Sequence, residues 1–194
     1  MTLSLDAPPK LTWKIDLEGG QRRLQEAILY VAKQCQSAPS FGLIKLNKIL
    51  WRADFVSFAE RGQPVTGRQY QRLPQGPAPV EMKPVLNEML RAGLIRIELA
   101  RVINYDERRV TPLTEPSLAF FTKGDLDQLD RSIFFYWEKN GRETSDQSHG
   151  AAWRTREDGD SMPYELAYLS DEPLSVETRN RLLNKAQARG LRSL

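Results

Sequence analysis

Few residues in this sequence have the chemistry for catalysis. His149 and Cys35 are the only histidine and the only cysteine. A hydrolytic triad would have to use His149 as its base, and no nucleophile motif surrounds it. Cys35 lies on the apolar stripe of a predicted helix, which predicts a buried thiol rather than a nucleophile. Asp158 and Asp160 lie in a polar loop without apolar surroundings that would raise a carboxyl pKa. We therefore predict a protein that is not an enzyme.

No metal site or cofactor is predicted either. One cysteine and one histidine are too few for a structural zinc site or an internal disulfide. The pair Gly19-Gly20 lacks the spacing and the lysine of a phosphate-binding loop.

The composition is that of one folded domain. Of 194 residues, 40% are hydrophobic and 27% are charged, which argues against disorder over most of the length. Apolar runs span only a few residues, which predicts no membrane contact. The N-terminus lacks the pattern of a secretory signal and disulfides cannot form within the chain, so we expect a cytoplasmic protein.

Charge is unevenly distributed along the chain. Residues 1–115 hold seventeen basic and twelve acidic residues, and residues 116–177 hold six basic and thirteen acidic ones. The last segment, 178–194, has five basic residues and no acidic one. This asymmetry indicates an acidic face and a basic C-terminal helix, which are either solvated surfaces or partner contacts.

The pattern of apolar residues predicts a mainly α fold with a small β-hairpin (α+β). Helices are expected over 22–36, 43–61, 80–91, 125–139 and 175–189, with a short helix reaching His149 and short strands at 11–17 and 65–73. The hairpin is expected from 94–99 and 109–113. We predict one compact domain over 20–177, an N-terminal arm at 1–19, and a basic helix at 178–194.

The segment 43–61 differs from the other predicted helices because apolar residues cover nearly all its faces. Such a helix lies at the centre of its domain, and its charged side chains then need partners. Lys45 and Lys48 lie three residues apart, and Asp54 follows on the same helix. They either form internal ion pairs or line a groove that receives a partner.

The helix at 80–91 followed by the hairpin has the order of a winged-helix unit. In such a unit the helix enters the major groove of DNA and the hairpin carries arginines to phosphate. Arg108 and Arg109 stand where those arginines would be, but the helix itself carries Glu81 and Glu88. These acids favour a hairpin that simply covers the core, and a DNA-binding regulator remains the alternative.

Two blocks of sequence resemble the SocA-like antitoxin domain, also called the Panacea domain, of bacterial and phage toxin–antitoxin systems. The first block runs from Lys45 to Phe55 and continues through the Gly-Pro turn that ends at Pro79. The second contains Ser148-His149, Trp153 and the stretch 162–165. Family members often have an aromatic residue before Gly-Pro, where this chain has Gln75.

The resemblance implies an antitoxin that neutralises a protein toxin without catalysis, by direct binding or by delivery to a protease. A proteolytic adaptor that uses the C-terminal helix is thus a further alternative. The motif residues, which are structural or line a partner groove, are Lys45, Leu46, Lys48, Asp54, Tyr70, Gly76, Pro77, His149 and Trp153. His149 and Trp153 would share a face if one helix ran through Gly150, as a core-edge pair or a partner contact.

We expect contacts with the toxin to come from the arm, the hairpin and the terminal helix. Aromatic and basic side chains dominate interface energetics. The candidate contacts are Trp13, Tyr105, Arg108, Arg109, Arg181 and Lys185.

Overall fold

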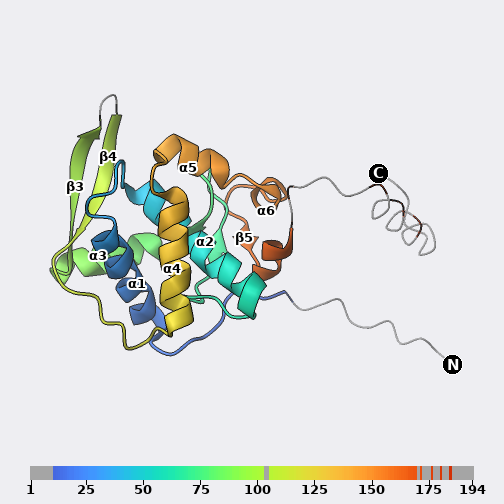
Figure 1. The fold of residues 1–194 in the computed structure, drawn as a ribbon, viewed down its shortest axis with the longest axis horizontal. Coiled ribbons are helices and arrows are strands. Elements are labelled where there is room, and N and C mark those ends of the chain that lie inside the picture. Colours follow the sequence, from blue (N-terminus) through green and yellow to red (C-terminus); the bar gives the residue numbers. More distant parts are fainter. Residues whose placement is uncertain are drawn as a thin grey trace.

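The computed structural model describes residues 11–102 and 105–169, and the single positions 171, 176, 180 and 184. Within them it shows mainly helices with two small antiparallel sheets, which confirms the predicted α+β fold (Figure 1). Residues 1–10 of the arm and nearly all of the predicted basic helix lie outside the described residues.

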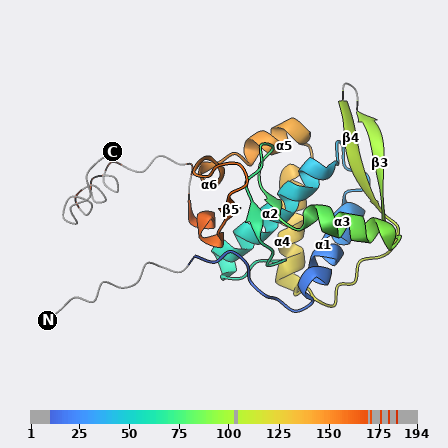
Figure 2. The same cartoon turned by 180° about the vertical axis from the view of Figure 1, so that it is seen from behind.

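Helix α2 (Leu43–Arg61) is the centre of the domain, as its apolar faces predict. It packs against α1 (Gly20–Gln34) and α4 (Lys123–Tyr136), and α3 (Met82–Arg91) packs against α1 (Figures 1 and 2). Leucine, isoleucine and valine side chains from these helices form the main core, which also contains the buried Cys35 thiol.

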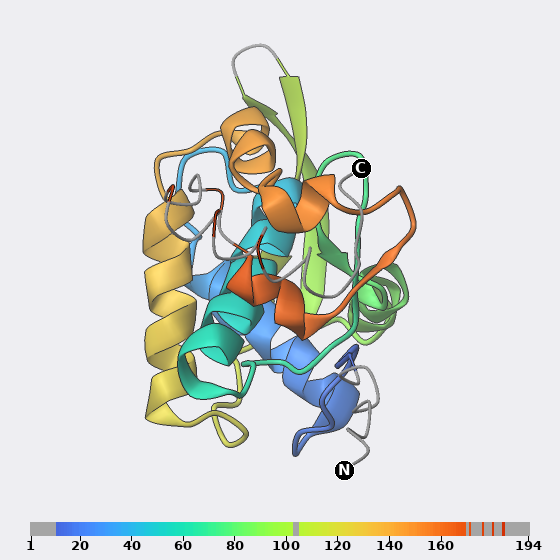
Figure 3. The same cartoon turned by 90° about the vertical axis from the view of Figure 1, so that its right-hand side faces the viewer.

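The hairpin is longer than the sequence indicated. Strand β3 (Ile95–Val102) pairs with β4 (Tyr105–Pro112) in one continuous antiparallel register. Its base packs on the helices through Ile95 and Val110, and its far half extends beyond the rest of the domain (Figure 3). In the far half, charged residues such as Arg101 and Asp106 stand opposite each other. This half lacks the alternation of apolar and polar residues from which a strand is predicted, so the sequence did not indicate it.

The second sheet is small and has the order β2-β1-β5. Strands β1 (Tyr70–Gln71), β2 (Ala78–Pro79) and β5 (Ser161–Met162) have two residues each, so the strand predicted over 65–73 is mostly irregular. Beside the sheet lies a second, smaller core in which Phe55, Tyr70 and Tyr164 are packed ring against ring.

The C-terminal half adds α5 (Gly141–Gln147), α6 (Ala151–Arg154) and the 3-10 helix η1 (Tyr164–Tyr168). The helix predicted to reach His149 is therefore shorter, and Gly150 separates it from α6. Asn140 caps α5 together with Glu143 in a capping box.

One other expectation was wrong. Segment 11–17 does not form a strand, although the Ile15 amide donates to the Gly67 carbonyl and the Thr12 carbonyl accepts from the Tyr164 amide. Leu90 on α3 and Phe134 on α4 are exposed. No helix among the described residues is long and apolar enough to cross a membrane.

Candidate functional site

Lys48 is held inside the domain by the Gly-Pro turn. Its Nζ donates to the Pro77 carbonyl at 2.7 Å, and its side chain is almost completely buried. Burial lowers the pKa of Lys48 to about 7 because the charged form loses its water. The partner is a backbone carbonyl, and no described carboxylate lies within ion-pair distance, so of the two alternatives for this lysine the internal ion pair is wrong.

Lys45 has the same kind of role one helical turn earlier. Its Nζ donates to the carbonyls of Pro39 and Trp137, at 2.7 and 2.9 Å. These contacts connect α2 to the loop before it and to the end of α4. Burial lowers the pKa of Lys45, and the nearby Glu107 carboxylate opposes this effect. Here too, a carbonyl bond replaces the expected ion pair.

Gly76 is placed where no other residue fits. Its φ is +91°, a left-handed conformation that side chains disfavour. A Cβ at this position would collide with Ser148 Oγ and lie 2.7 Å from Lys48 Cε. The turn therefore packs its backbone directly against α2 and the residue that follows α5.

His149 and Trp153 lie on opposite sides of Gly150 and still stack. Their ring centroids are 3.9 Å apart with an interplanar angle of 19°. Trp153 Nε1 donates to the Leu73 carbonyl at 2.9 Å, and the Arg72 guanidinium lies 3.7 Å from the Trp153 ring centroid. The pair is half-buried and bonded to backbone, as expected for a pair at the edge of the core, but loop geometry rather than one helix aligns it.

Ser145 brings a hydroxyl beside His149. Ser145 Oγ lies 3.4 Å from His149 Nε2, and it donates its proton to the Gln75 carbonyl at 3.1 Å. Burial and the charge of Lys48 lower the pKa of His149. Because its hydrogen is directed at a carbonyl, this hydroxyl connects α5 to the turn, and a hydrolase would need that hydrogen directed at the histidine.

Asp54 lies at a distance from the turn, in the second core. Its carboxylate accepts from the Thr66 amide and hydroxyl, each at 2.5 Å, and from the Tyr164 hydroxyl at 3.2 Å. Burial raises the pKa of Asp54 to about 6, and these donors partly offset it. Burial and the Asp54 charge also raise the pKa of Tyr70. Asp54 is thus bonded to neutral donors, and the ion-pair alternative is wrong for it as well.

The structure therefore divides the nine motif residues between two places. Lys48, Gly76, Pro77, His149 and Trp153 meet at the turn 73–77, whereas Asp54 and Tyr70 meet in the second core. Leu46 is buried in the main core, and Lys45 connects loops at the start of α2.

The candidate partner contacts are more dispersed. Trp13 and Arg108 are exposed, whereas Arg109 points inward and donates to the carbonyls of Cys35, Gln36 and Ala38 at 2.6 to 3.3 Å. Its guanidinium thus binds the carbonyls that follow α1. The Tyr105 side chain, Arg181 and Lys185 lie outside the described residues.

One feature that the sequence did not indicate is a groove of about 320 Å³ between α2, β2, α3 and the hairpin. Its walls are mostly apolar, and Leu43, Leu86 and Ile97 are among them. Asn47, on α2, lines it with a buried Oδ1 that has no hydrogen-bond partner among the described residues. In the sequence, Asn47 is one of several polar residues on α2, and nothing distinguished it as part of a site.

Other residues at the turn were also missed as site residues. Ser145, Ser148 and Arg72 complete the contacts around it, and Ser148 was visible only as the neighbour of His149. Within the ranges 11–102 and 105–169, no three His, Cys, Asp or Glu side chains gather as a metal site would require.

The fold and these contacts define a closed helical domain whose motif residues hold its own loops in place. Residues 46–154, more than half of the chain, match the family model described as "Antitoxin SocA-like, Panacea domain". The chain belongs to this family of antitoxin domains, which confirms the resemblance seen in the sequence. No curated protein and no solved structure matches the chain.

Proposed function

We propose that this protein is the antitoxin of a bacterial or phage toxin–antitoxin pair and that it binds and neutralises a cognate protein toxin. The observation that carries the proposal is the family match over residues 46–154, which includes nearly all of α2, the Gly-Pro turn, the hairpin and the His149–Trp153 pair. A protein toxin as partner follows from membership of an antitoxin family.

The contacts at the turn support binding rather than catalysis. The polar groups that enzymes use most often as bases or nucleophiles are committed to backbone carbonyls: Lys48 to Pro77 and Ser145 to Gln75. These contacts hold the turn against α2 and α5, which gives both side chains a structural role. We propose that the domain acts as a rigid body whose outer surface contacts the toxin.

The position of Arg109 weighs against the winged-helix alternative. A DNA-binding hairpin directs its arginines to phosphate, whereas the Arg109 guanidinium donates to carbonyls at the end of α1. Binding to its own promoter is tested by a mobility shift at low salt.

The proteolytic adaptor remains an alternative route to neutralisation, and its predicted docking helix lies outside the described residues. Deleting residues 178–194 tests it directly. An unchanged toxin half-life in cells with the shortened protein would reject assisted degradation and leave direct inhibition.

The test of the main proposal is a growth experiment. The neighbouring open reading frame is expressed under tight control, alone and with this protein. We expect growth arrest that co-expression relieves, and a stable complex of the two purified proteins. A toxic neighbour that is not rescued, or a harmless one, would contradict the proposal for that pair of genes.

A further inference from the structure

The open edge of the hairpin lies beside the groove that contains Asn47. Strand β3 pairs on one side with β4, and the sheet contains only these two strands in the described part of the chain. Ile97 on β3 lines the groove together with Leu86 and Leu90 of α3. The exposed strand edge and the apolar groove are thus adjacent parts of one surface, which we call the hairpin groove.

The register shows which backbone groups of β3 are free. The Leu113 amide donates to the Leu94 carbonyl at 2.8 Å, so these opposite residues form a hydrogen-bonded pair. Hydrogen-bonded and non-hydrogen-bonded pairs alternate along an antiparallel ladder. Ile97 and Leu99 therefore direct their N–H and C=O groups away from β4, toward the open edge.

The side chains on this face change from buried to exposed along the strand. Residues two apart in a strand share a face, so Ile95, Ile97 and Leu99 point the same way. Ile95 is buried, Ile97 is half-buried, and Leu99 is 76% exposed. Leu90 across the groove is 38% exposed. An apolar strip that continues into solvent beside free backbone groups is the surface to which an extended peptide adds as a further strand.

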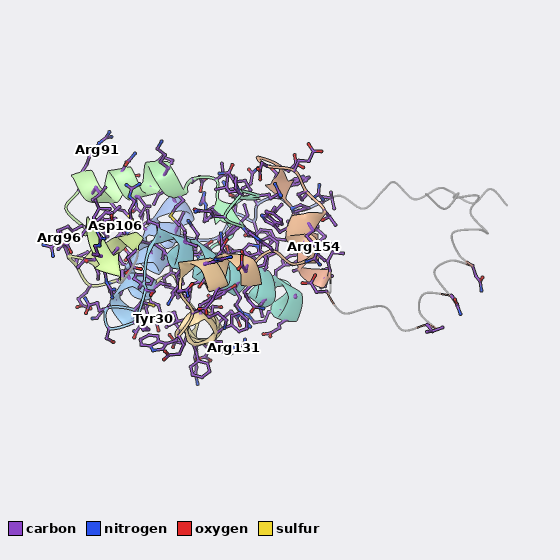
Figure 4. The ribbon with its side chains drawn as sticks, turned by 90° about the horizontal axis from the view of Figure 1, so that it is seen from above. Tyr30, Arg91, Arg96, Asp106, Arg131 and Arg154 are labelled. Atoms are coloured by element: carbon purple, nitrogen blue, oxygen red, sulfur yellow. The ribbon has the colours of Figure 1, made fainter. Side chains whose placement is uncertain are left out.

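The basic residues that line the groove and the unpaired oxygen of Asn47 indicate which kind of segment would bind there. Lys83 and Arg108 line the groove, no acidic residue lines it, and neither cation has an ion-pair partner among the described residues. Figure 4 shows Arg91 and Arg96 at the same end of the molecule. The buried Oδ1 of Asn47 needs an N–H donor, since an unpaired buried acceptor is unfavourable. An acidic segment that supplies an N–H group would complement these features.

We propose that an extended segment of the protein partner adds to the β3 edge and fills the hairpin groove. The segment bears apolar side chains at alternate positions, which enter the groove, and a carboxylate that pairs with Lys83 or Arg108. One of its N–H groups donates to Asn47 Oδ1. The identity of the partner as a toxin rests on the proposed function, whereas the peptide chemistry rests on the groove.

The test uses the full-length protein and a matched pair of proline variants. Leu99→Pro removes an N–H from the open edge without removing a ladder bond. Asp106→Pro makes the same change on the outer side of β4, because Asp106 stands opposite Arg101 in another non-hydrogen-bonded pair. Displayed random peptides are selected on the wild-type protein, and their affinities for the two variants are then measured.

We expect selected peptides with alternating apolar residues and at least one acidic residue. Their affinity should fall by about ten-fold or more on Leu99→Pro and stay unchanged on Asp106→Pro, because strand addition uses main-chain hydrogen bonds. Recovery of no peptide, or of peptides that bind Leu99→Pro as tightly as wild type, would overturn the proposal. Circular dichroism checks that both proline variants are folded. If Leu99→Pro loses its hairpin, Leu90→Asp and Lys83→Glu take its place in the binding test.

The growth experiment then separates this inference from the antitoxin role. Rescue by wild type together with a loss of rescue by Leu99→Pro supports both. Equal rescue by wild type and Leu99→Pro retains the antitoxin role and rejects the hairpin groove as its contact. If wild type does not rescue, the proposed function fails for that gene, and the peptide selection still decides whether the groove binds extended acidic segments.

Discussion

The Gly-Pro turn and the hairpin groove differ in how their polar groups are used. At the turn, Lys48 and Ser145 donate to carbonyls, and a Cβ on Gly76 would collide with its neighbours. At the groove, Asn47 Oδ1 has no described partner and Leu99 is exposed. At the turn the polar side chains are hydrogen-bonded to neighbouring backbone, whereas the groove has a buried acceptor without a described partner and an exposed apolar side chain.

This difference separates the residues that define the family from those available to a partner. A buried lysine bonded to a carbonyl is sensitive to any change around it, because its charge must stay partnered. Surface strands and grooves tolerate change, because few contacts depend on them. We infer that the motif preserves a scaffold and that partner choice depends on the hairpin end. Substitutions at the turn should therefore reduce stability, and those at the groove should reduce binding.

The largest loss of stability is expected for Gly76→Ala. The variant combines the strain of a left-handed alanine with a collision against Ser148 and Lys48, and should lower the free energy of unfolding by about 3 kcal/mol or more. Urea denaturation at neutral pH measures the change.

Gly62→Ala is the matched control for this variant. Gly62 has a φ of +71°, and a Cβ added there would meet no atom within 4 Å among the described residues. Only strain remains, which costs about 1 kcal/mol. Equal losses for the two variants would mean that close packing at the turn contributes nothing.

The pH dependence of stability should reveal the carboxyl group of Asp54. Its pKa of about 6 in the folded protein lies above its ordinary value of 3.8, so the folded state holds this proton more tightly. The contribution to stability is fully present below about pH 4 and is lost as the pH rises through 6, a change of about 3 kcal/mol. Asp54→Asn should remove this slope in urea denaturation measured from pH 4 to 7.

Lys48 should change the pH dependence of stability in the opposite direction from Asp54, because its pKa is lowered whereas that of Asp54 is raised. Its pKa is lowered from the ordinary value of 10.5 to about 7, so the folded state binds this proton less tightly than the unfolded chain does. Stability from this group therefore increases as the pH rises above about 7. The Asp54→Asn variant should still gain stability as the pH rises above 7, because Lys48 is unchanged. If this variant loses the gain in stability at alkaline pH, the slope at acid pH has an origin other than Asp54.

The sequence was sufficient for the elements that bury a complete apolar face. Helix α2 was predicted with its observed bounds, because apolar residues on nearly every face leave a central position as the only stable one. Cys35 was placed in the core for the same reason. The family could also be predicted, since its motif includes residues that packing alone does not require.

Polar partners could not be predicted, because they depend on which loops meet. Lysines in an apolar helix suggested carboxylates, but the turn and the end of α4 offered carbonyls instead. The spacing of His149 and Trp153 predicted that one continuous helix would align them. They stack instead across a break between two helices. The groove was invisible because its walls come from α2, α3 and the hairpin, which are distant in sequence.

A smaller loss is expected where the turn is held by a single hydrogen bond. Trp153→Phe keeps a ring between His149 and Arg72 but removes the Nε1 donor to the Leu73 carbonyl. We expect a loss of about 1 kcal/mol, measured by urea denaturation. Trp13→Phe, at an exposed ring in the arm, should change stability by a few tenths of a kcal/mol. A larger loss from Trp13→Phe would show that the arm contributes to the scaffold.

The smallest change in stability is expected at the groove, where the effect on binding should be greatest. Leu90→Asp places a carboxylate among apolar walls on an already exposed position, and stability should change by less than about 0.5 kcal/mol. The new charge repels an acidic segment, so neutralisation of the toxin should fall by about ten-fold or more. Phe134→Asp on α4, whose ring is 84% exposed and far from the groove, should leave both quantities unchanged. Toxin titration in the growth assay measures the first effect, and loss of neutralisation by Phe134→Asp instead of Leu90→Asp would move the contact surface from the hairpin to α4.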